Sequence, residues 1–235
     1  MSALAAIFKG PGLSRAASGR SLRGWRRSAL ALVVLAALGG AAPVPDAGST
    51  EAGAGLEVTS GKVQARADGT FAVDVPEMRA VLRGEGGGDA GELRFTYRGP
   101  TVERSHLASG EVREQLGLKL RAHDGCNLVY VMWWIAPHPG IAVSVKRNPG
   151  QRTHAECGAR GYENLRPSWS AAAPAMAPGS HHTLAARIDA DELQVSADGA
   201  PVWRGRLPDS ARLLRGPVGV RSDNVMFDFT LKDVR

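Results

Sequence analysis

The chain has 235 residues, of which 43% are hydrophobic and 22% charged, so it is neither wholly disordered nor fibrous. Its formal net charge is +6, but residues 1–42 hold six of the 29 basic residues and no acidic one. That leaves 23 basic and 23 acidic residues in the remainder. A neutral remainder gives no support to nucleic-acid binding, and two cysteines are too few for a disulfide-dense miniprotein or a four-cysteine zinc site.

Residues 1–42 have the pattern of a signal peptide. A basic stretch ends at Arg26-Arg27 and is followed by an apolar run over 29–38, which is shorter than the roughly 20 residues that span a bilayer. Small residues at 39–42 suit cleavage by a signal peptidase. We therefore expect export to the periplasm or the extracellular space. The alternative is an uncleaved anchor, in which case the protein would also contact the membrane.

Export changes the interpretation of the cysteines. Cys126 and Cys157 are the only possible intramolecular pair, and we expect a disulfide between them in an oxidising compartment. The alternative is two buried thiols in a reducing compartment.

Residues 43–55 are rich in Ala, Gly, Pro and Ser, which predicts a flexible linker. Residues 56–235 then form one domain, large enough to bury a core without a cofactor. Alternation of apolar and polar residues predicts about ten short strands in it. These strands are 71–75, 93–97, 116–120, 127–135, 141–146, 182–188, 192–197, 201–206, 218–221 and 225–231. Gly- and Pro-rich turns between them favour an all-β antiparallel sandwich of jelly-roll type.

Two local patterns bear on this assignment. Asp198-Gly199 predicts a tight hairpin turn. Val112, Leu116 and Leu120 have helical spacing, but Gly117 weakens a helix and Leu118 would break its apolar face, so we expect a strand there.

The last fifty residues carry a family resemblance. Leu193–Gly199 has the pattern L-x-V-x-x-D-G, Trp203 follows, and Gly216–Asn224 has the pattern G-x-V-G-x-R-S-D-N before the last strand. This order resembles the end of concanavalin A-like lectin/glucanase jelly rolls, most closely the laminin-G-like and sugar-hydrolase-associated modules of secreted bacterial proteins. The resemblance implies a jelly roll, a fold that hosts lectins, hydrolases, lyases and adhesion modules. We expect the motif residues to build turns, with the side chains of Asp223 and Asn224 bonded to backbone.

The catalytic patterns of that superfamily are missing. No E-x-D-x-E or E-x-D-x-x-E triplet of a glucanase occurs in the chain. Arg113–Leu116 loosely resembles the Arg-rich strand of alginate lyases, but their Gln-x-His and Tyr-Lys strands are absent. The resemblance therefore transfers no catalytic residue.

A carbohydrate-binding surface is the best-supported candidate site. If Val129 faces the core, basic and aromatic side chains gather on the opposite face of neighbouring strands, although a shift of one residue would bury them instead. The expected ligand-binding residues are Lys119, Arg121, Tyr130, Trp134 and Lys146. Sugar rings stack on aromatic faces, and donors bind their hydroxyl groups.

The segment 148–180 is long for a loop, and long loops are often functional. A disulfide would hold His154, Glu156 and Tyr162 near the strand 127–135, where His154 and Glu156 could act as an acid/base pair. The alternative is a solvated loop without a catalytic role, which is held by the disulfide and whose polar side chains bond to its own backbone.

Metal binding has little support. Calcium could bind at Asp223, Asn224 or Asp228, but we expect no cofactor. The sequence thus favours an exported module that binds carbohydrate or a cell-envelope glycan without catalysis. The alternatives are a polysaccharide-degrading glycosidase or lyase and a protein-binding adhesion module.

Overall fold

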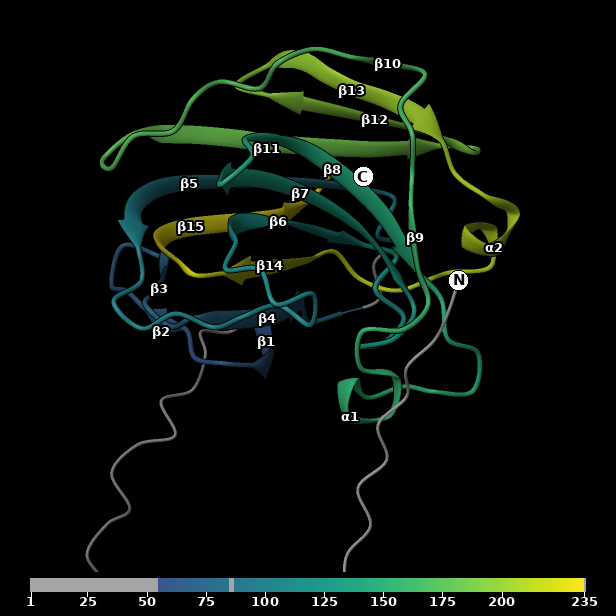
Figure 1. The fold of residues 1–235 in the computed structure, drawn as a ribbon, viewed down its shortest axis with the longest axis horizontal. Coiled ribbons are helices and arrows are strands. Elements are labelled where there is room, and N and C mark those ends of the chain that lie inside the picture. The colour runs from purple at the N-terminus through teal and green to yellow at the C-terminus, as the bar shows by residue number, and fades with distance from the viewer. Residues whose placement is uncertain (1–54, 85–86, 235) are drawn as a thin grey trace, which may run out of the picture. The chain divides into compact units, whose positions relative to one another are not determined.

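The computed structural model describes residues 55–84 and 87–234. The expected signal peptide at 1–42 and nearly all of the expected linker at 43–55 lie outside these residues. In the described part, two antiparallel β-sheets face each other across a shared apolar core (Figure 1). The all-β sandwich predicted from the sequence is confirmed.

One sheet has seven strands. In spatial order they are β1 (Leu56–Ser60), β4 (Glu77–Leu82), β14 (Gly219–Asp223), β6 (Glu114–Leu120), β7 (Leu128–Ala136), β8 (Gly140–Lys146) and β9 (Tyr162–Asn164). The C-terminal motif strand β14 therefore lies between β4 and β6, far from β4 in sequence. This sheet carries the candidate site on its outer face.

The other sheet has eight strands. In spatial order they are β10 (Trp169–Ser170), β13 (Ala200–Arg206), β12 (Glu192–Ala197), β11 (His181–Asp189), β5 (Ala90–Pro100), β15 (Val225–Asp233), β3 (Phe71–Val73) and β2 (Gln64–Ala65). Asp198 and Gly199 both have positive φ, 52° and 82°, in the tight turn between β12 and β13. The hairpin expected there is confirmed.

All ten expected strands are present, and 112–120 contains β6 rather than a helix. Leu116 and Leu118 of β6 are fully buried in the core, as strand alternation requires. Gly117 sits between them where a Cβ would lie 2.1 Å from the carbonyl oxygen of Val131, so no larger residue fits. The helical spacing in this segment was therefore coincidental.

The sequence missed the short strands β1, β2, β4, β9 and β10. The expected loop at 148–180 is correspondingly more ordered than predicted, because it contains β9, β10 and the one-turn helix α1 (His154–Cys157). A second one-turn helix, α2, spans Asp209–Arg212. Within the described ranges no helix has the length and apolar character needed to cross a membrane.

The core fixes which face of each strand is available for binding. Val129, Val131 and Trp133 of β7 are buried between the sheets, and the Trp133 ring meets Phe95 of the opposite sheet edge-to-face at 5.9 Å. Alternation then places Tyr130, Met132 and Trp134 on the outer face of the seven-stranded sheet.

Candidate functional site

A pocket of about 420 Å³ lies on the outer face of the seven-stranded sheet, and we call it the outer-face pocket. Strands β4, β14, β6, β7 and β8 form its floor, while segment 106–113 and segment 154–164 form two walls. The floor residues are Glu77, Arg79, Arg221, Gln115, Tyr130, Met132, Trp134, Ala142 and Ser144. The wall residues are His106, Leu107, Ala108, Ser109, Arg113, His154, Ala159, Tyr162 and Asn164.

Strand register explains why the sheet is hollow here. Arg79 pairs with Arg221, and that row continues through Gly117 and Met132 to Ala142. Gly117 has no side chain and Ala142 has a short one. At these two positions little projects from the sheet, whereas Arg79 and Arg221 have long side chains. Long polar side chains thus border an open space.

Asp223 organises the floor, although it is only 1% exposed. Its Oδ2 accepts hydrogen bonds from Gln115 Nε2 at 2.6 Å and from Arg221 Nε at 2.8 Å. Its Oδ1 accepts a longer bond, 3.4 Å, from Arg79 Nη2. This differs from the sequence expectation, because the Asp223 carboxylate bonds to side chains across three strands rather than to a turn backbone.

Arg221 connects the floor to one wall. Its Nη1 donates to the Tyr162 hydroxyl at 3.2 Å, and its guanidinium lies 5.0 Å from the centre of the Tyr130 ring. Burial on its own would lower the pKa of Arg221, but the Asp223 carboxylate and the two phenols outweigh it and raise that pKa. Arg221 therefore stays charged, and its position is fixed by three partners.

The aromatic residues differ in what they can offer a ligand. Tyr130 is 2% exposed and stacks on Tyr162 with ring centres 6.0 Å apart, and burial raises its pKa to about 12. Arg113 lies over the Trp134 ring at 3.8 Å and covers one of its faces. Tyr162 is 39% exposed, which makes it the most exposed of the tyrosine and tryptophan residues that line the pocket, and Lys146 Nζ lies 5.2 Å from the centre of its ring.

Lys119 lies on the same face, paired in register with Tyr130, but it is 3% exposed and does not line the pocket. Burial, and then the positive charges of Arg79 and Arg221, lower its pKa to about 8. No ion-pair partner for its ammonium group occurs among the described residues.

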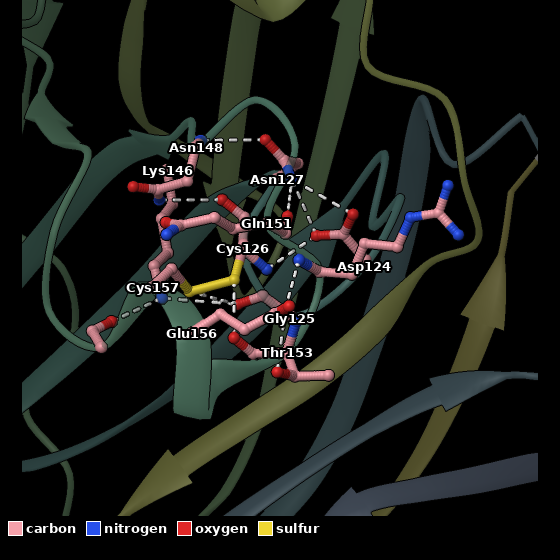
Figure 2. Close-up of a disulfide and its surroundings, with 12 residues drawn as sticks. Asp124, Gly125, Cys126, Asn127, Lys146, Asn148, Gln151, Thr153, Glu156 and Cys157 are labelled. Carbon is pink, nitrogen blue, oxygen red and sulfur yellow. Dashed lines mark hydrogen bonds between the residues drawn. A yellow bond between two sulfur atoms is a disulfide. The ribbon is translucent and has the colours of Figure 1, made fainter.

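Lys146 supports a wall instead of contacting the pocket. Its Nζ donates to the carbonyl oxygen of Gly158 at 2.8 Å. It also donates to that of Gly125 at 3.4 Å, next to Cys126 of the disulfide (Figure 2). Burial, and then the charges of Arg221 and Arg79, lower its pKa to about 8.

The disulfide between Cys126 and Cys157 is present, as expected, and both cysteines are fully buried (Figure 2). It ties α1 to the start of β7. In addition, Asn148 donates to the carbonyl oxygens of Cys126 and Arg160, which holds the segment leading to β9. These bonds place the wall that carries Tyr162.

The structure does not bring His154 and Glu156 together over the pocket. The Glu156 carboxylate accepts bonds from the backbone N–H groups of Thr153 at 2.7 Å and Arg152 at 2.9 Å, which cap α1 and lower the pKa of Glu156. His154 does line the pocket, and burial followed by the charges of Lys146 and Arg79 lowers its pKa.

Arg121 lies away from the pocket. It directly follows β6 and has a positive φ of 46°, and its guanidinium bonds to Asp89 and to the carbonyl oxygen of Ala211 in α2. Of the sequence-derived candidates, the structure thus gathers Tyr130, Trp134, His154 and Tyr162 around one pocket, with Lys119 and Lys146 behind its surface and Arg121 and Glu156 elsewhere.

The residues considered for calcium do not converge. Asp223 bonds to the arginines of the floor, whereas Asp228 is in the other sheet, ion-paired with Arg66 and Arg98. Asn224 bonds to backbone groups of Ser105, as expected for a turn residue. Among residues 55–84 and 87–234, no group of three or more His, Cys, Asp or Glu side chains could hold a metal ion.

Several pocket residues were not singled out from the sequence: Glu77, Arg79, Gln115, Asn164 and Arg221. A signal for the β4 residues existed, because Met78 and Ala80 alternate with Arg79 in a short strand pattern. Arg221 was predicted to end the strand 218–221 and to belong to a turn motif, but its cross-strand partners could not be predicted.

Comparison with known proteins identifies the fold. The carbohydrate-binding module CBM66 from Bacillus subtilis matches 76% of this chain and 96% of its own, with 12% identity and a TM-score of 0.52. A tetrameric galectin from the ball sponge Cinachyrella sp. covers 68% of this chain and 90% of its own, at 16% identity and a TM-score of 0.36. The Crh5 transglycosylase covers 76% of this chain and 65% of its own, at 18% identity and a TM-score of 0.41.

No protein-family model and no curated protein sequence matches the chain. The likeness to CBM66 shows the fold, an antiparallel β-sandwich of jelly-roll type, as the sequence predicted.

Proposed function

We propose that the protein is an exported carbohydrate-binding module that holds a glycan in the outer-face pocket without cleaving it. The observation that carries the proposal is the pairing of an open aromatic ring, Tyr162, with the donors of Arg79, Arg221 and Asn164 in one pocket. A sugar presents an apolar face to an aromatic ring and hydroxyl groups to surrounding donors. The pocket volume of about 420 Å³ is within the range of small-ligand sites.

The arrangement of carboxylates supports binding over cleavage. Glu77 and Asp223 are register partners on the floor, so they are the pair that could serve a glycosidase. Both, however, are ion-paired with Arg79, and Asp223 is buried with both oxygens hydrogen-bonded. Glycoside hydrolysis needs one carboxyl group to protonate the leaving oxygen and another to attack or activate water, whereas the oxygens of Asp223 are bonded to Gln115, Arg221 and Arg79.

The disulfide and one structural neighbour add support. A buried disulfide that fixes the pocket wall suits an oxidising compartment, in keeping with export to the periplasm or the extracellular space. CBM66 is named as a carbohydrate-binding module, which agrees with a binding role for the same fold. A glycan of the cell envelope is the proposed partner.

The proposal is tested by glycan-array screening of the purified protein, followed by calorimetry on the best ligands. We expect binding of at least one glycan, and loss of most of the affinity in Tyr162→Ala. Trp169→Ala is the matched control, because Trp169 is 49% exposed but lies in the other sheet. Absence of binding to any glycan at millimolar concentration would refute the proposal, as would equal affinities in the two variants. Turnover of a bound polysaccharide would refute its non-catalytic part.

A further inference from the structure

We infer that the glycan bound in the outer-face pocket carries an acidic group, a carboxylate or a sulfate ester, which lies against Arg79 and Arg221. This inference rests on the proposed function and specifies its ligand class. The argument comes from how positive charge is distributed over the floor.

Two arginines face each other directly on this floor. Arg79 of β4 and Arg221 of β14 are register partners on the same face, an arrangement in which like charges repel. Both share the single carboxylate of Asp223, and the contact from Arg79 is the longer one at 3.4 Å. Glu77 neutralises part of the charge of Arg79 from the side. The guanidinium of Arg113 also lines the pocket, but Glu111 is ion-paired with it, so the inference rests on Arg79 and Arg221.

A buried cation lies behind the arginines. Lys119 is 3% exposed and has no ion-pair partner among the described residues, so its charge adds to the field of the floor. Three basic groups around the pocket, Lys119, Lys146 and His154, have pKa values lowered first by burial and also by the charges of Arg79 and Arg221. At each of these groups the effect of at least one arginine exceeds that of the opposing carboxylate, Glu57, Asp124 or Glu77, so these carboxylates offset the positive charge only in part.

The position of Tyr162 relates this field to a bound sugar. The Tyr162 hydroxyl accepts a hydrogen bond from Arg221 Nη1, and within the described residues no partner is bonded to Arg221 Nη2. A sugar ring stacked on Tyr162 would place its substituents next to that guanidinium. An acidic substituent there would form charge-assisted hydrogen bonds, which are shorter and stronger than those to a hydroxyl group. It would also relieve the repulsion between the two arginines.

The test uses glycans in matched acidic and neutral forms. One arm compares oligogalacturonate with its carboxyl-reduced form, and the other compares a sulfated galactan oligosaccharide with its desulfated form. We expect the acidic member of at least one pair to bind about tenfold or more tightly, with an advantage that shrinks as salt is raised. The arm that shows the difference identifies the acidic group.

Two variants test the placement. Arg79→Gln should weaken binding of the acidic form much more than binding of the neutral form, and so remove most of the acidic advantage. Arg94→Gln, on an exposed arginine of the other sheet, should leave that advantage intact. Lys119→Met provides a second test that does not depend on the fold tolerating the change at Arg79. It should reduce affinity for the acidic form only.

The outcomes separate the inference from the proposed function. If neutral glycans bind through Tyr162 and acidic forms bind no better, the inference is wrong and the proposed function stands. An acidic preference that survives both Arg79→Gln and Lys119→Met overturns the placement of the acidic group. If no carbohydrate binds at all, the proposed function itself fails.

Discussion

Lys119→Met should stabilise the unliganded protein at pH 7. Burial and two neighbouring arginines lower the pKa of Lys119 from 10.5 to about 8. The charged ammonium group is therefore less stable in the folded protein than in the unfolded chain, and this difference is the energetic disadvantage of Lys119. One pKa unit corresponds to about 1.4 kcal/mol, which makes the disadvantage about 3 kcal/mol at pH 7. Methionine keeps most of the aliphatic chain and removes the charge. We expect the free energy of unfolding to rise by about 1–3 kcal/mol, in line with other replacements of buried charges by apolar groups.

The gain should depend on pH. Below pH 8 the folded and unfolded wild-type chains both carry the proton on Lys119, and the full disadvantage applies. Between pH 8 and 10.5 the unfolded chain binds more protons than the folded one, so wild-type stability rises with pH relative to the variant. The advantage of Lys119→Met should therefore shrink through this window and vanish above it.

Urea denaturation of both proteins at pH 7 and pH 10 measures the effect, and Lys232→Met controls for loss of an exposed lysine. A variant that is less stable than the wild type at pH 7 would refute the reasoning. So would a gain of the same size at both pH values, because that gain would come from packing.

Three further predictions follow from contacts in the structure. Reduction of the Cys126–Cys157 disulfide should lower stability by about 3 kcal/mol and the melting temperature by several degrees, and an unchanged thermal melt with reductant would contradict this. Asp223→Asn should lower the free energy of unfolding by about 3–5 kcal/mol in urea titration, because it leaves the buried Arg221 without its carboxylate. Gly117→Ala should lower it by about 2 kcal/mol or more by the same assay, since the new methyl group would meet a backbone carbonyl at 2.1 Å.

The fold was accessible from the sequence because strand alternation and turn residues are local signals. The turn at Asp198-Gly199 and the alternation of Val129, Val131 and Trp133 both appear in the structure as expected. The disulfide was accessible because two cysteines allow one pairing. Short edge strands such as β9 were missed, since three residues leave no detectable period.

The site was only partly accessible, because it depends on which strands adjoin. Alternation along β7 placed Tyr130 and Trp134 on the same face of the strand, but it left open whether that face was buried. Arg79 and Arg221 are 142 positions apart and meet only through the pairing of β4 with β14, which no local pattern reveals. Conversely, Arg121 and Glu156 were residue types suited to the predicted site, but neither lines the pocket. A change of backbone direction at Arg121 turns it away, and Glu156 caps helix α1.

The two parts of the pocket are under different constraints on sequence change. The floor belongs to strands whose opposite faces form the core, so substitutions there also disturb folding. The β9 wall pairs with β8 alone, all three of its residues are exposed, and its position depends on a disulfide and a few bonds to Lys146 and Asn148. Mutations at Tyr162 or Asn164 can therefore accumulate with little loss of stability. Under the proposed function, this edge is where a lineage could change its preferred sugar while the sandwich stays the same, and where a library for altered specificity should begin.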